Sequence, residues 1–390
     1  MGRPYLARAH ARGLRVAVLD SAEALSWPET RAALGPDDQG YAVAGADDEG
    51  WLVAAAAALR DGPVCGVVAF SEQHVRAAAL LADELGLPGP GLRAVLTSRN
   101  KLVQRELFGR RNLAQPEYHL ARSAEDAAAW AEGRYPVVAK PLSSSGSMGV
   151  QIVTDENELH TWCQENDSPK SFLVEGYLSG PEYSVEAVAS AGEIVFWSVT
   201  EKITTEAPHF VELEHHVPAQ VGGEEKSAIR SVLGEVAGAL GMRSGIMHLE
   251  LRLEPAGPHI MEVAVRTPGD YIMDVVQAAT GVDLYDAVIA VACDDTPSVT
   301  ATDDHIASVW FPAPEPGTVT SVSGVDRVQA LEGVVNIEID VAAGSVIHPL
   351  RSSMDRIGMV IYRAADRVAL ESLRKRIHDE LVISVQPSSS

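Results

Sequence analysis

The sequence lacks most features of secreted, membrane-bound and disulfide-linked proteins. Its three cysteines, Cys65, Cys163 and Cys293, show neither disulfide nor metal-ligand spacing, which is typical of a reducing cytoplasm. No stretch approaches the ~18 uninterrupted apolar residues of a membrane span, and the opening MGRPYLARAHARG has no apolar core of the signal-peptide type. We therefore expect a cytoplasmic protein.

Basic side chains are also scarce. Lys and Arg total 31 against 54 Asp and Glu, which gives a formal net charge of −23. This charge opposes binding to a nucleic-acid backbone or to an anionic membrane, so we expect neither as a partner. A phosphate-bearing small molecule is not excluded, because it needs only a local cluster of donors. The simplest reason for the acidity is solubility.

The N-terminal part of the chain alternates predicted helices with short apolar strands, which is the α/β pattern of a parallel sheet. The expected elements are helices over 3–12, 51–60 and 72–85 and strands over 14–19 and 64–70. The chain opens in a helix whose usual preceding strand and glycine loop are absent. Either the sheet is short by one strand or the true start lies upstream of Met1, and we favour the second.

Further along the chain the pattern changes twice. The turn-rich stretch LGLPGPG (85–91) precedes a predicted helix over 98–109, for which Ser98 is a plausible N-cap. Strands then dominate from 137 to 264, with helices near 155–166 and 224–240. Beyond about residue 300, short strands and an amphipathic helix predict a small α+β domain. Those last elements are strands near 306–311, 333–340 and 356–362 and a helix over 364–380.

A β-hairpin with an electrostatic problem is predicted over residues 248–266, HLELRLEPAGPHIMEVAVR. Two alternating runs flank a Pro/Gly turn. If the loop is EPAGP (254–258), Leu253 pairs with His259, and Glu250 lies directly opposite Glu262. Like charges that face each other across a strand pair are destabilising. The pattern alone does not say what makes this arrangement worth keeping.

Residues 135–153, YPVVAKPLSSSGSMGVQIV, predict a strand that ends at Lys140, a Ser/Gly loop, and a second strand from Val150. Backbone N–H groups and hydroxyls of such a loop can cradle phosphate oxygens. It is not a Walker A loop, because the lysine precedes the glycines and a strand follows them. A mobile flap over phosphates and a plain hairpin with a Ser-rich turn both fit this stretch taken alone.

Residues 172–189, FLVEGYLSGPEYSVEAVA, contain two strands separated by a kinked connector. Glu175 and Glu182 lie seven residues apart around it. A carbonyl and one carboxylate could meet an adenine edge, and the other carboxylate could meet ribose hydroxyls. Two solvent-facing loop acids are the simpler alternative.

The order of these motifs resembles the ATP-grasp superfamily. Lys101 in SRNKLVQRELF (98–108) is followed by Lys140 with its loop, by EGYLSGPE, and by the hairpin acids with Arg266. Within the superfamily the sequence is most similar to the L-amino-acid ligases, which form peptide bonds between amino acids. TEKITTEAPHFVELEHHVPA (200–219) looks like their substrate-side segment, and the resemblance covers nearly the whole chain.

The resemblance implies an ATP-grasp fold of mixed α/β and α+β class. An N-terminal Rossmann-like (pre-ATP-grasp) domain is expected over 1–97, with its first strand apparently missing. The ATP-grasp domain follows over 98–300, and a small α+β domain over 301–390. The two lobes of the ATP-grasp domain are expected to be 98–171 and 172–300.

The resemblance also implies roles for individual residues. ATP would meet Lys101, Lys140, Ser143, Ser144, Ser145, Gly146, Ser147, Met148, Glu175, Gly176, Tyr177, Leu178 and Glu182. Mg²⁺, or Mn²⁺ in its place, would bind Glu250 and Glu262. Substrate would contact Glu72, Lys202, Glu212, His215, Arg266 and Gly269. The catalytic residues would be Arg266, His248 and Lys140.

One position departs from the family pattern. Relatives usually read Glu-x-Asn-x-Arg where this chain reads Glu262-Val-Ala264-Val-Arg266, so the Asn oxygen that completes the metal site is missing. Water could fill that position, because Mg²⁺ often keeps several waters. The predicted register places His248 opposite Ala264, on the same face as Arg266.

The reaction implied by the resemblance activates a carboxylate with ATP as an acylphosphate, which an amine then attacks to form an amide or peptide bond. The expected partners are small carboxylate and amine substrates, among which amino acids are favoured; a homodimer is left open. An ATP-grasp enzyme with a non-amino-acid acceptor and a non-catalytic ATP-binding protein are the alternatives. His248 and Glu212 are both candidates for the group that deprotonates the amine.

Two other features carry less weight. The pair His215-His216 lacks the Asp, Glu or Cys spacing of a zinc site. His348 and Arg356 in the C-terminal part could touch substrate, but structural roles are favoured.

Overall fold

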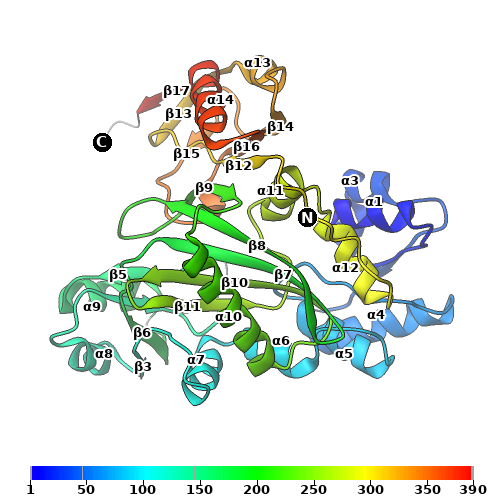
Figure 1. Ribbon diagram of the computed structural model, residues 1–390, viewed down its shortest axis with the longest axis horizontal. Coiled ribbons are helices and arrows are strands. Elements are labelled where there is room, and N and C mark those ends of the chain that lie inside the picture. The colour runs from blue at the N-terminus through cyan, green and yellow to red at the C-terminus, as the bar shows by residue number, and fades with distance from the viewer. Residues whose placement is uncertain (1, 46, 144–145, 147, 168, 388–390) are drawn as a thin grey trace.

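A computed structural model describes residues 2–45, 47–143, 146, 148–167 and 169–387. Its centre is an antiparallel sheet of eight strands in the order β11-β10-β7-β8-β9-β12-β16-β14 (Figure 1). The strands are β7 (Glu182–Ser190), β8 (Glu193–Thr204), β9 (Glu212–Val217), β10 (Gly245–Glu254), β11 (Gly257–Ala264), β12 (Ile306–Trp310), β14 (Val334–Ile339) and β16 (Gly358–Ala364). The sheet crosses the expected boundary at residue 300, because β12, β14 and β16 continue it.

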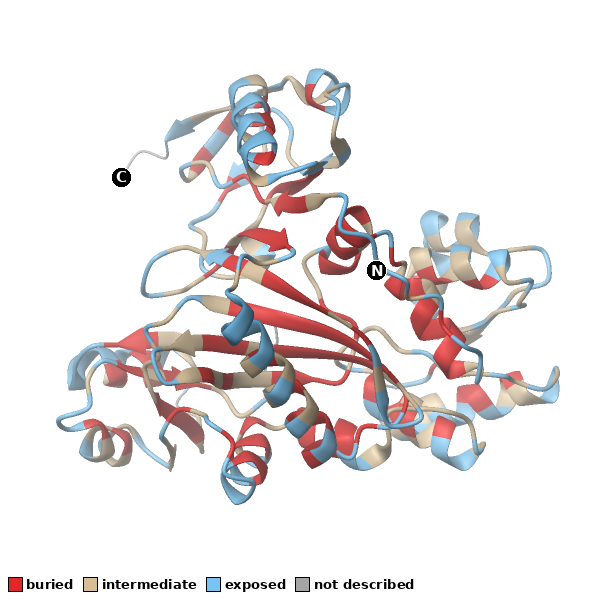
Figure 2. Cartoon of the chain, viewed as in Figure 1, coloured by how far each residue is buried: buried red, intermediate tan, exposed pale blue. Residues whose placement is uncertain are grey.

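Helices cover both faces of this sheet. One face packs through Val185, Leu249 and Ile260 against helices on the N-terminal side and α10. Part of the other face packs through Val188 and Ile246 against a second group of helices. The first group is α5 (Val75–Glu84), α6 (Leu92–Ser98), α7 (Lys101–Arg110) and α10 (Gly223–Leu240), and the second is α1 (Arg3–Ala11), α11 (Ile272–Thr280) and α12 (Leu284–Ala292). Figure 2 shows the central strands buried along most of their length.

A smaller sheet forms a separate lobe in the order β3-β6-β4-β5. Its strands are β3 (Tyr118–Ala121), β4 (Val137–Lys140), β5 (Gln151–Val153) and β6 (Phe172–Gly176), and α8 (Ala124–Ala131) and α9 (Glu156–Glu165) pack on it. The predicted strand–loop–strand of residues 135–153 is confirmed by β4 and β5. Ser144, Ser145 and Ser147 of the loop lie outside the described residues.

The N-terminal part contains a two-stranded parallel sheet, β1 (Ala17–Asp20) with β2 (Gln39–Ala42), together with α2 (Ala22–Ser26), α3 (Pro28–Ala33) and α4 (Asp48–Arg60). The prediction of a strand over 64–70 is wrong. No described strand pairs with the backbone of these residues. Together with β1 they line a largely apolar cavity of about 1110 Å³.

Two of the three cysteines meet in this part of the fold. Cys65 Sγ lies 2.9 Å from Cys293 Sγ, although 228 residues separate them in the sequence, and both are free thiols. Sequence spacing alone gave no sign of this contact.

The hairpin confirms the facing acids but corrects the loop. Glu250 pairs with Glu262 and His248 with Ala264. The turn is tighter than expected, because Glu254 pairs with Gly257 and Leu253 with Pro258. A bulge beyond Glu250 absorbs the one-residue difference.

The predicted helix over 98–109 is two helices, α6 and α7, with Asn100 between them. Asn100, not Ser98, caps α7 by accepting a hydrogen bond from the Val103 N–H. Ser98 ends α6, and its hydroxyl donates to the Val95 carbonyl. The break turns the chain so that Lys101 begins α7 on the side of the hairpin.

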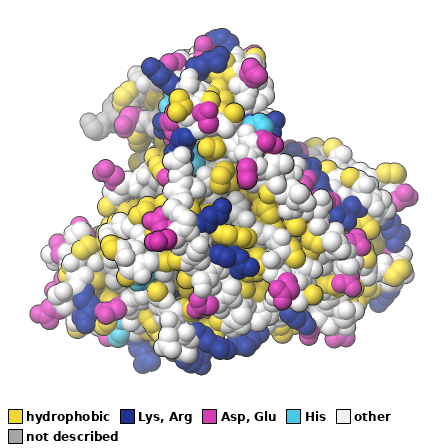
Figure 3. All heavy atoms as spheres, in the orientation of Figure 1, with side chains coloured by type: hydrophobic (Ala, Val, Ile, Leu, Met, Phe, Trp, Pro, Cys, Tyr) yellow, Lys and Arg dark blue, Asp and Glu magenta, His cyan; other side chains and the backbone are white. Residues whose placement is uncertain are grey.

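The C-terminal part adds a third sheet of order β15-β13-β17. Its elements are β13 (Gly317–Ser323), α13 (Val325–Gln329), β15 (Val346–Ile347), the 3-10 turn η1 (Ser353–Asp355), α14 (Arg367–Glu380) and β17 (Val382–Pro387). No single described helix is long and apolar enough to cross a membrane; α11 and α12 meet that criterion only as a pair bent by 104°. On the face drawn in Figure 3, Lys and Arg are interspersed with Asp and Glu.

Arg105 on α7 holds the hairpin against the smaller sheet. Its guanidinium donates to the carbonyls of Ile260 and Met261 at the bulge and to both carboxylate oxygens of Glu175 on β6. The side chain is 1 % exposed. All four acceptors therefore depend on one buried cation.

Replacing Arg105 by Met should lower the free energy of unfolding by about 3–5 kcal/mol, because it leaves a buried carboxylate and two carbonyls short of partners. Urea denaturation measures this change. Arg110→Met, at an exposed position of the same helix, is the control and should change stability by no more than about 0.5 kcal/mol. An Arg105 variant as stable as the control would contradict this role.

Candidate active site

The predicted site residues share one face of the large sheet. Strand register aligns Glu250 with Ser184 and Thr200, and Arg252 with Glu182, which pairs in turn with Lys202. Directly opposed residues project to the same side of a sheet, so alternate positions form polar rows. His215 joins the row that contains Lys202. Helices α1, α11 and α12 cover only part of this face. The polar rows occupy the remaining part and form the floor of the candidate site.

Each acid of the facing pair is matched by a lysine. Glu250 accepts from Lys202 Nζ at 2.7 Å, and Glu262 accepts from Lys101 Nζ at 3.0 Å. Burial opposes the ionisation of Glu250, but Lys202 and His248 outweigh it and hold the pKa of that carboxyl well below its ordinary value. Glu250 is therefore available as a carboxylate, and the two lysines offset the repulsion between the facing acids.

Lys202 is shared by three carboxylates. Its Nζ lies 2.9 Å from Glu182, 2.7 Å from Glu250 and 3.4 Å from Glu212. Burial would lower the pKa of this ammonium, yet the three acids raise it well above its ordinary value. One buried cation therefore joins the expected ribose, metal and substrate positions.

Lys140 and Glu175 form a buried ion cluster with Arg105. Lys140 Nζ lies 2.6 Å from Glu175 Oε2. Burial lowers the pKa of Lys140 to about 8 even with Glu175 beside it. Burial also opposes ionisation of Glu175, but the two cations lower its pKa to about 2. The Glu175 carboxylate is occupied by these partners, which leaves the backbone around Gly176 as the part of this segment that can meet a base.

The connector after β6 carries the other expected nucleotide residues. Tyr177 stacks on Phe210, with ring centres 6.1 Å apart, and the Arg252 guanidinium lies over both rings. Arg252 also donates to the Leu178 carbonyl and to Glu182. Gly180 permits close contact with the hairpin, because a Cβ there would lie 2.1 Å from the Leu253 carbonyl oxygen. Tyr177, Leu178 and Glu182 are thus held at the end of the polar face. Met148 in the flanking loop is 51 % exposed, and Ser143 and Gly146 are also exposed.

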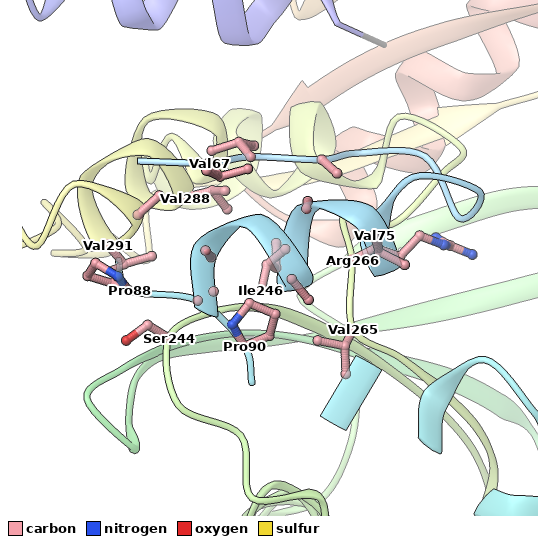
Figure 4. Close-up of a pocket in the computed structure, with 18 residues that line it drawn as sticks. Val67, Val75, Pro88, Pro90, Ser244, Ile246, Val265, Arg266, Val288 and Val291 are labelled. Atoms are coloured by element: carbon pink, nitrogen blue, oxygen red, sulfur yellow. The ribbon is translucent and has the colours of Figure 1, made fainter. Parts of the chain in front are cut away.

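Arg266 and Glu72, two of the expected substrate residues, are paired. Arg266 Nε donates to Glu72, and Arg99 Nη1 donates to the same carboxylate at 2.8 Å. Figure 4 shows the Arg266 side chain extending away from a small cavity lined mainly by apolar groups. Arg266 is one of the residues that line this cavity, which has a volume of about 60 Å³. Gly269 follows in the same loop, and its carbonyl accepts from the Ile272 N–H at the start of α11.

His248 lies between two carboxylates. Its Nδ1 is 2.9 Å from Glu186 and its Nε2 is 3.3 Å from Glu250. Glu186 is fully buried and accepts from Ser184 and Thr200. Burial disfavours the imidazolium, but the two acids outweigh it and raise the pKa of His248 to about 9. At neutral pH this histidine is a cation that donates to both neighbours.

The remaining substrate candidates meet the C-terminal part of the chain. Glu212 accepts from the Ser353 hydroxyl at 2.8 Å, and His215 Nε2 lies 3.2 Å from Asp270. Asp270 also accepts from Arg356. The structure thus brings Arg356 to the substrate side, whereas His348 has no described contact with the site residues.

The donor set fits a magnesium ion. Mg²⁺ binds through one or two carboxylates together with substrate phosphates and water, and Glu250 and Glu262 supply two carboxylates on one face. The described residues contain no cluster of three or more His, Cys, Asp or Glu side chains arranged for a metal. Ala264, opposite His248, adds no ligand. A magnesium ion at this position would therefore have two carboxylate side chains available and would depend on phosphate and solvent for the rest.

Several residues of the site were missed from the sequence. Arg105 lies one helical turn after Lys101, so helical spacing could have indicated it. Arg252 and Glu186 belong to the same strand alternation that identified Glu250 and Glu182. Asp270 and Phe210 lie in loops, where no periodic signal exists.

Two parts of the chain match known protein families. The chain matches the model of an ATP-grasp domain over residues 133–274 and that of the L-amino acid ligase C-terminal domain 2 over residues 309–386. The chain thus contains a region similar to ATP-grasp domains and a region similar to a C-terminal domain of L-amino acid ligases. Both likenesses agree with the motif order in the sequence.

Individual relatives agree with these likenesses. The chain is 28% identical to the uncharacterized protein y4rH of Sinorhizobium fredii, over 84% of this chain and 69% of that protein. It is 21% identical to the L-arginine-specific L-amino acid ligase of Bacillus subtilis, over 76% and 74% of the two chains. The fold is similar to that of the L-amino acid ligase from Bacillus licheniformis, with a TM-score of 0.83, 23% identity and coverage of 98% and 96%. The chain spans only 30% of the length of carnosine synthase 1 of Gallus gallus, at 26% identity over 65% of this chain.

The His248 cluster predicts a loss of stability at alkaline pH. The pKa of His248 is about 9 in the folded protein and about 6.5 when unfolded. Its contribution is therefore complete below pH 6.5 and disappears as the pH rises through 9, with a total of about 3 kcal/mol.

Urea denaturation of the metal-free and nucleotide-free protein at pH 6.5 and 9.5 measures this loss. His248→Gln should remove most of the pH dependence between these values, and His259→Gln, in the same hairpin, should retain it. If the free energy of unfolding changed equally between pH 6.5 and 9.5 in the wild type and in His248→Gln, the raised pKa would not belong to His248.

Proposed function

We propose that the protein is an ATP-dependent carboxylate–amine ligase that activates the carboxylate of an amino acid and joins it to an amine, releasing ADP and phosphate. The observation that carries the proposal is the facing pair Glu250 and Glu262, with Lys101 and Lys202 beside them on one polar face. The ATP-grasp and L-amino acid ligase domain matches support the same reaction.

The nucleotide lies, in this proposal, between the smaller sheet and the polar face. Lys101 and Lys140 bind its phosphates, and the loop 143–149 covers them. The backbone from Glu175 to Leu178 meets adenine, and Glu182 meets the ribose. Lys140 suits this role because burial has already desolvated its ammonium.

Glu250 and Glu262 would hold Mg²⁺, or Mn²⁺, and Ala264 would supply no ligand. When bound, the ion neutralises phosphate charge and screens the incoming carboxylate from the triphosphate. The ion requires both acids to be ionised, and the depressed pKa of Glu250 supports this.

The chemistry needs positioning and charge compensation more than covalent help. A substrate carboxylate oxygen attacks the γ-phosphorus and ADP leaves; the amine nitrogen then attacks the acyl carbon and phosphate leaves with the bonding electrons. Arg266 stabilises the charge that develops on the transferred group. His248, between Glu186 and Glu250, and Glu212 are the two candidates for the group that deprotonates the amine.

The proposal also covers the substrates and the cellular location. The substrates are small molecules, with Glu72, Lys202, Glu212, His215 and Gly269 around them. We place the reaction in the cytoplasm, and a homodimer remains open.

ADP release from ATP with a panel of amino-acid pairs tests this function. We expect release that depends on at least one amino acid, and hydroxylamine should trap the activated acid as an acyl hydroxamate. ATP binding without ADP release for any pair would instead favour a non-catalytic nucleotide-binding protein.

Glu250→Gln and Glu262→Gln should each lower the rate of ADP release at least about 100-fold, because each removes one charge from the metal position. Glu224→Gln, at an exposed position on α10, is the matched control and should keep the wild-type rate. Near-normal turnover in either metal-site variant would refute the assignment.

A further inference from the structure

Cys65 and Cys293 form a pair of thiols in the N-terminal part of the fold. Their Sγ atoms lie 2.9 Å apart, and both side chains are free thiols. Because the S–S bond of a disulfide is about 2.05 Å long, a further approach of about 1 Å is enough to join them. The third cysteine, Cys163, is buried in the core of the smaller-sheet lobe.

The fold holds Cys293 in a fixed position. This residue ends α12, and its N–H donates to the Ile289 carbonyl. Arg12 donates to Asp286 on α12 and to Asp295, two residues beyond Cys293. Hydrogen bonds on both sides thus fix the turn that carries this thiol.

Cys65 lies on a segment that is placed by packing alone. Residues 62–70 form no backbone hydrogen bond with any described residue. Gly66 lets the segment approach the end of α12, because a Cβ at this position would lie 2.8 Å from the Ala292 carbonyl oxygen. Close packing against α12 therefore brings the Cys65 thiol to Cys293.

A small reagent can reach both thiols. Cys65 and Cys293 line the largely apolar cavity of the N-terminal part, which has a volume of about 1110 Å³. Cys65 is exposed, and Cys293 is half-buried. The pair therefore combines contact between two thiols with a route to them from outside. In reducing compartments, such pairs typically form transient, redox-sensing disulfides.

We propose that Cys65 and Cys293 are an oxidation site at which a low-molecular-weight disulfide reversibly forms an intramolecular disulfide. The Cys65 thiolate attacks one sulfur of the reagent, which gives a mixed disulfide and releases one thiolate. Cys293 then loses its proton and attacks Cys65 Sγ, which expels the second thiolate. Two protein thiols are oxidised, the reagent is reduced to two thiols, and the two protein protons end on them.

The surroundings of Cys293 make it the second thiol to react. Burial, Cys65 and Asp295 raise the pKa of the Cys293 thiol to about 12, and the thiolate is the nucleophile in this exchange. Once Cys65 carries the mixed disulfide, it has no charge that opposes the ionisation of Cys293. The first step therefore favours the second.

The bond fastens the segment 62–70 to the helix layer of the large sheet. Val67 of this segment and Val288 of α12 line the same small cavity (Figure 4). The segment leads to Glu72, which accepts from Arg266. The two cysteines are 228 residues apart, and a crosslink that closes a long loop stabilises a fold mainly by restricting the unfolded chain. This inference is independent of the proposed ligase activity.

Incubation of the native protein with glutathione disulfide tests the site. Thiol counting after denaturation should show that the wild type loses two of its three thiols. Peptide mapping should find Cys65 joined to Cys293, and dithiothreitol should reverse the bond. Cys163→Ala, the matched control, should form the same bond. A wild type that keeps three thiols, or that forms only mixed disulfides or linked dimers, would overturn the proposal.

Single substitutions separate the two steps. Cys293→Ser should accumulate one glutathione on Cys65. Cys65→Ser should react at least about 10-fold more slowly, because only a half-buried thiol with a raised pKa remains in that pair. Equal rates in the two variants would show that Cys65 is not the first thiol and would overturn the order of attack.

Urea denaturation shows whether the bond fits the native fold. The midpoint of the oxidised wild type should lie about 1 M above that of the reduced protein. Cys65→Ser, treated in the same way, should show no shift. An oxidised wild type with a midpoint at or below that of the reduced protein would show that the bond distorts the fold, and this result would contradict the proposal.

Discussion

The structure of the site depends on the compensation of closely spaced carboxylates by a few buried cations. Glu250 and Glu262 face each other across the hairpin, and without Lys202 and Lys101 their repulsion would weaken the strand pair that carries them. Lys202 also neutralises part of the charge of Glu182 and Glu212. Since Lys202 contacts acids on three different strands, its charge balance depends on the register of the sheet.

Strand alternation made the floor of the site predictable from the sequence. In a period-two pattern, identifying one functional residue also identifies the face on which its neighbours lie, and this linked His248 with Glu250 and Glu262. The expected loop was nevertheless wrong by one residue, and the correct pairing survived because the bulge restored it. A bulge depends on contacts such as those of Arg105, which lies more than 150 residues away in the sequence.

The parts that could not be predicted lie where no period exists. Loops contain Asp270 and Phe210, and Arg356 lies beside a short turn. Only the folded chain brings these residues to the site. The prediction of a strand over residues 64–70 was wrong although the sequence pattern there is clear. Its apolar run has strong strand character, but a strand needs a neighbour, and pairing is a property of the whole fold. The proposed roles of the nucleotide and substrate residues still come from the family resemblance.

The cations that balance these acids have a second use in the proposed reaction. A divalent ion between Glu250 and Glu262 offers each carboxylate a stronger partner than an ammonium group does. Lys101 and Lys202 then become available to other anions, and the phosphates of the nucleotide are the nearest new ones that the reaction provides. Lys202 keeps Glu182 and Glu212 as partners in either state. Glu262, once bound to the ion, would attract Lys101 less strongly, so in the proposed reaction this lysine would also meet the triphosphate.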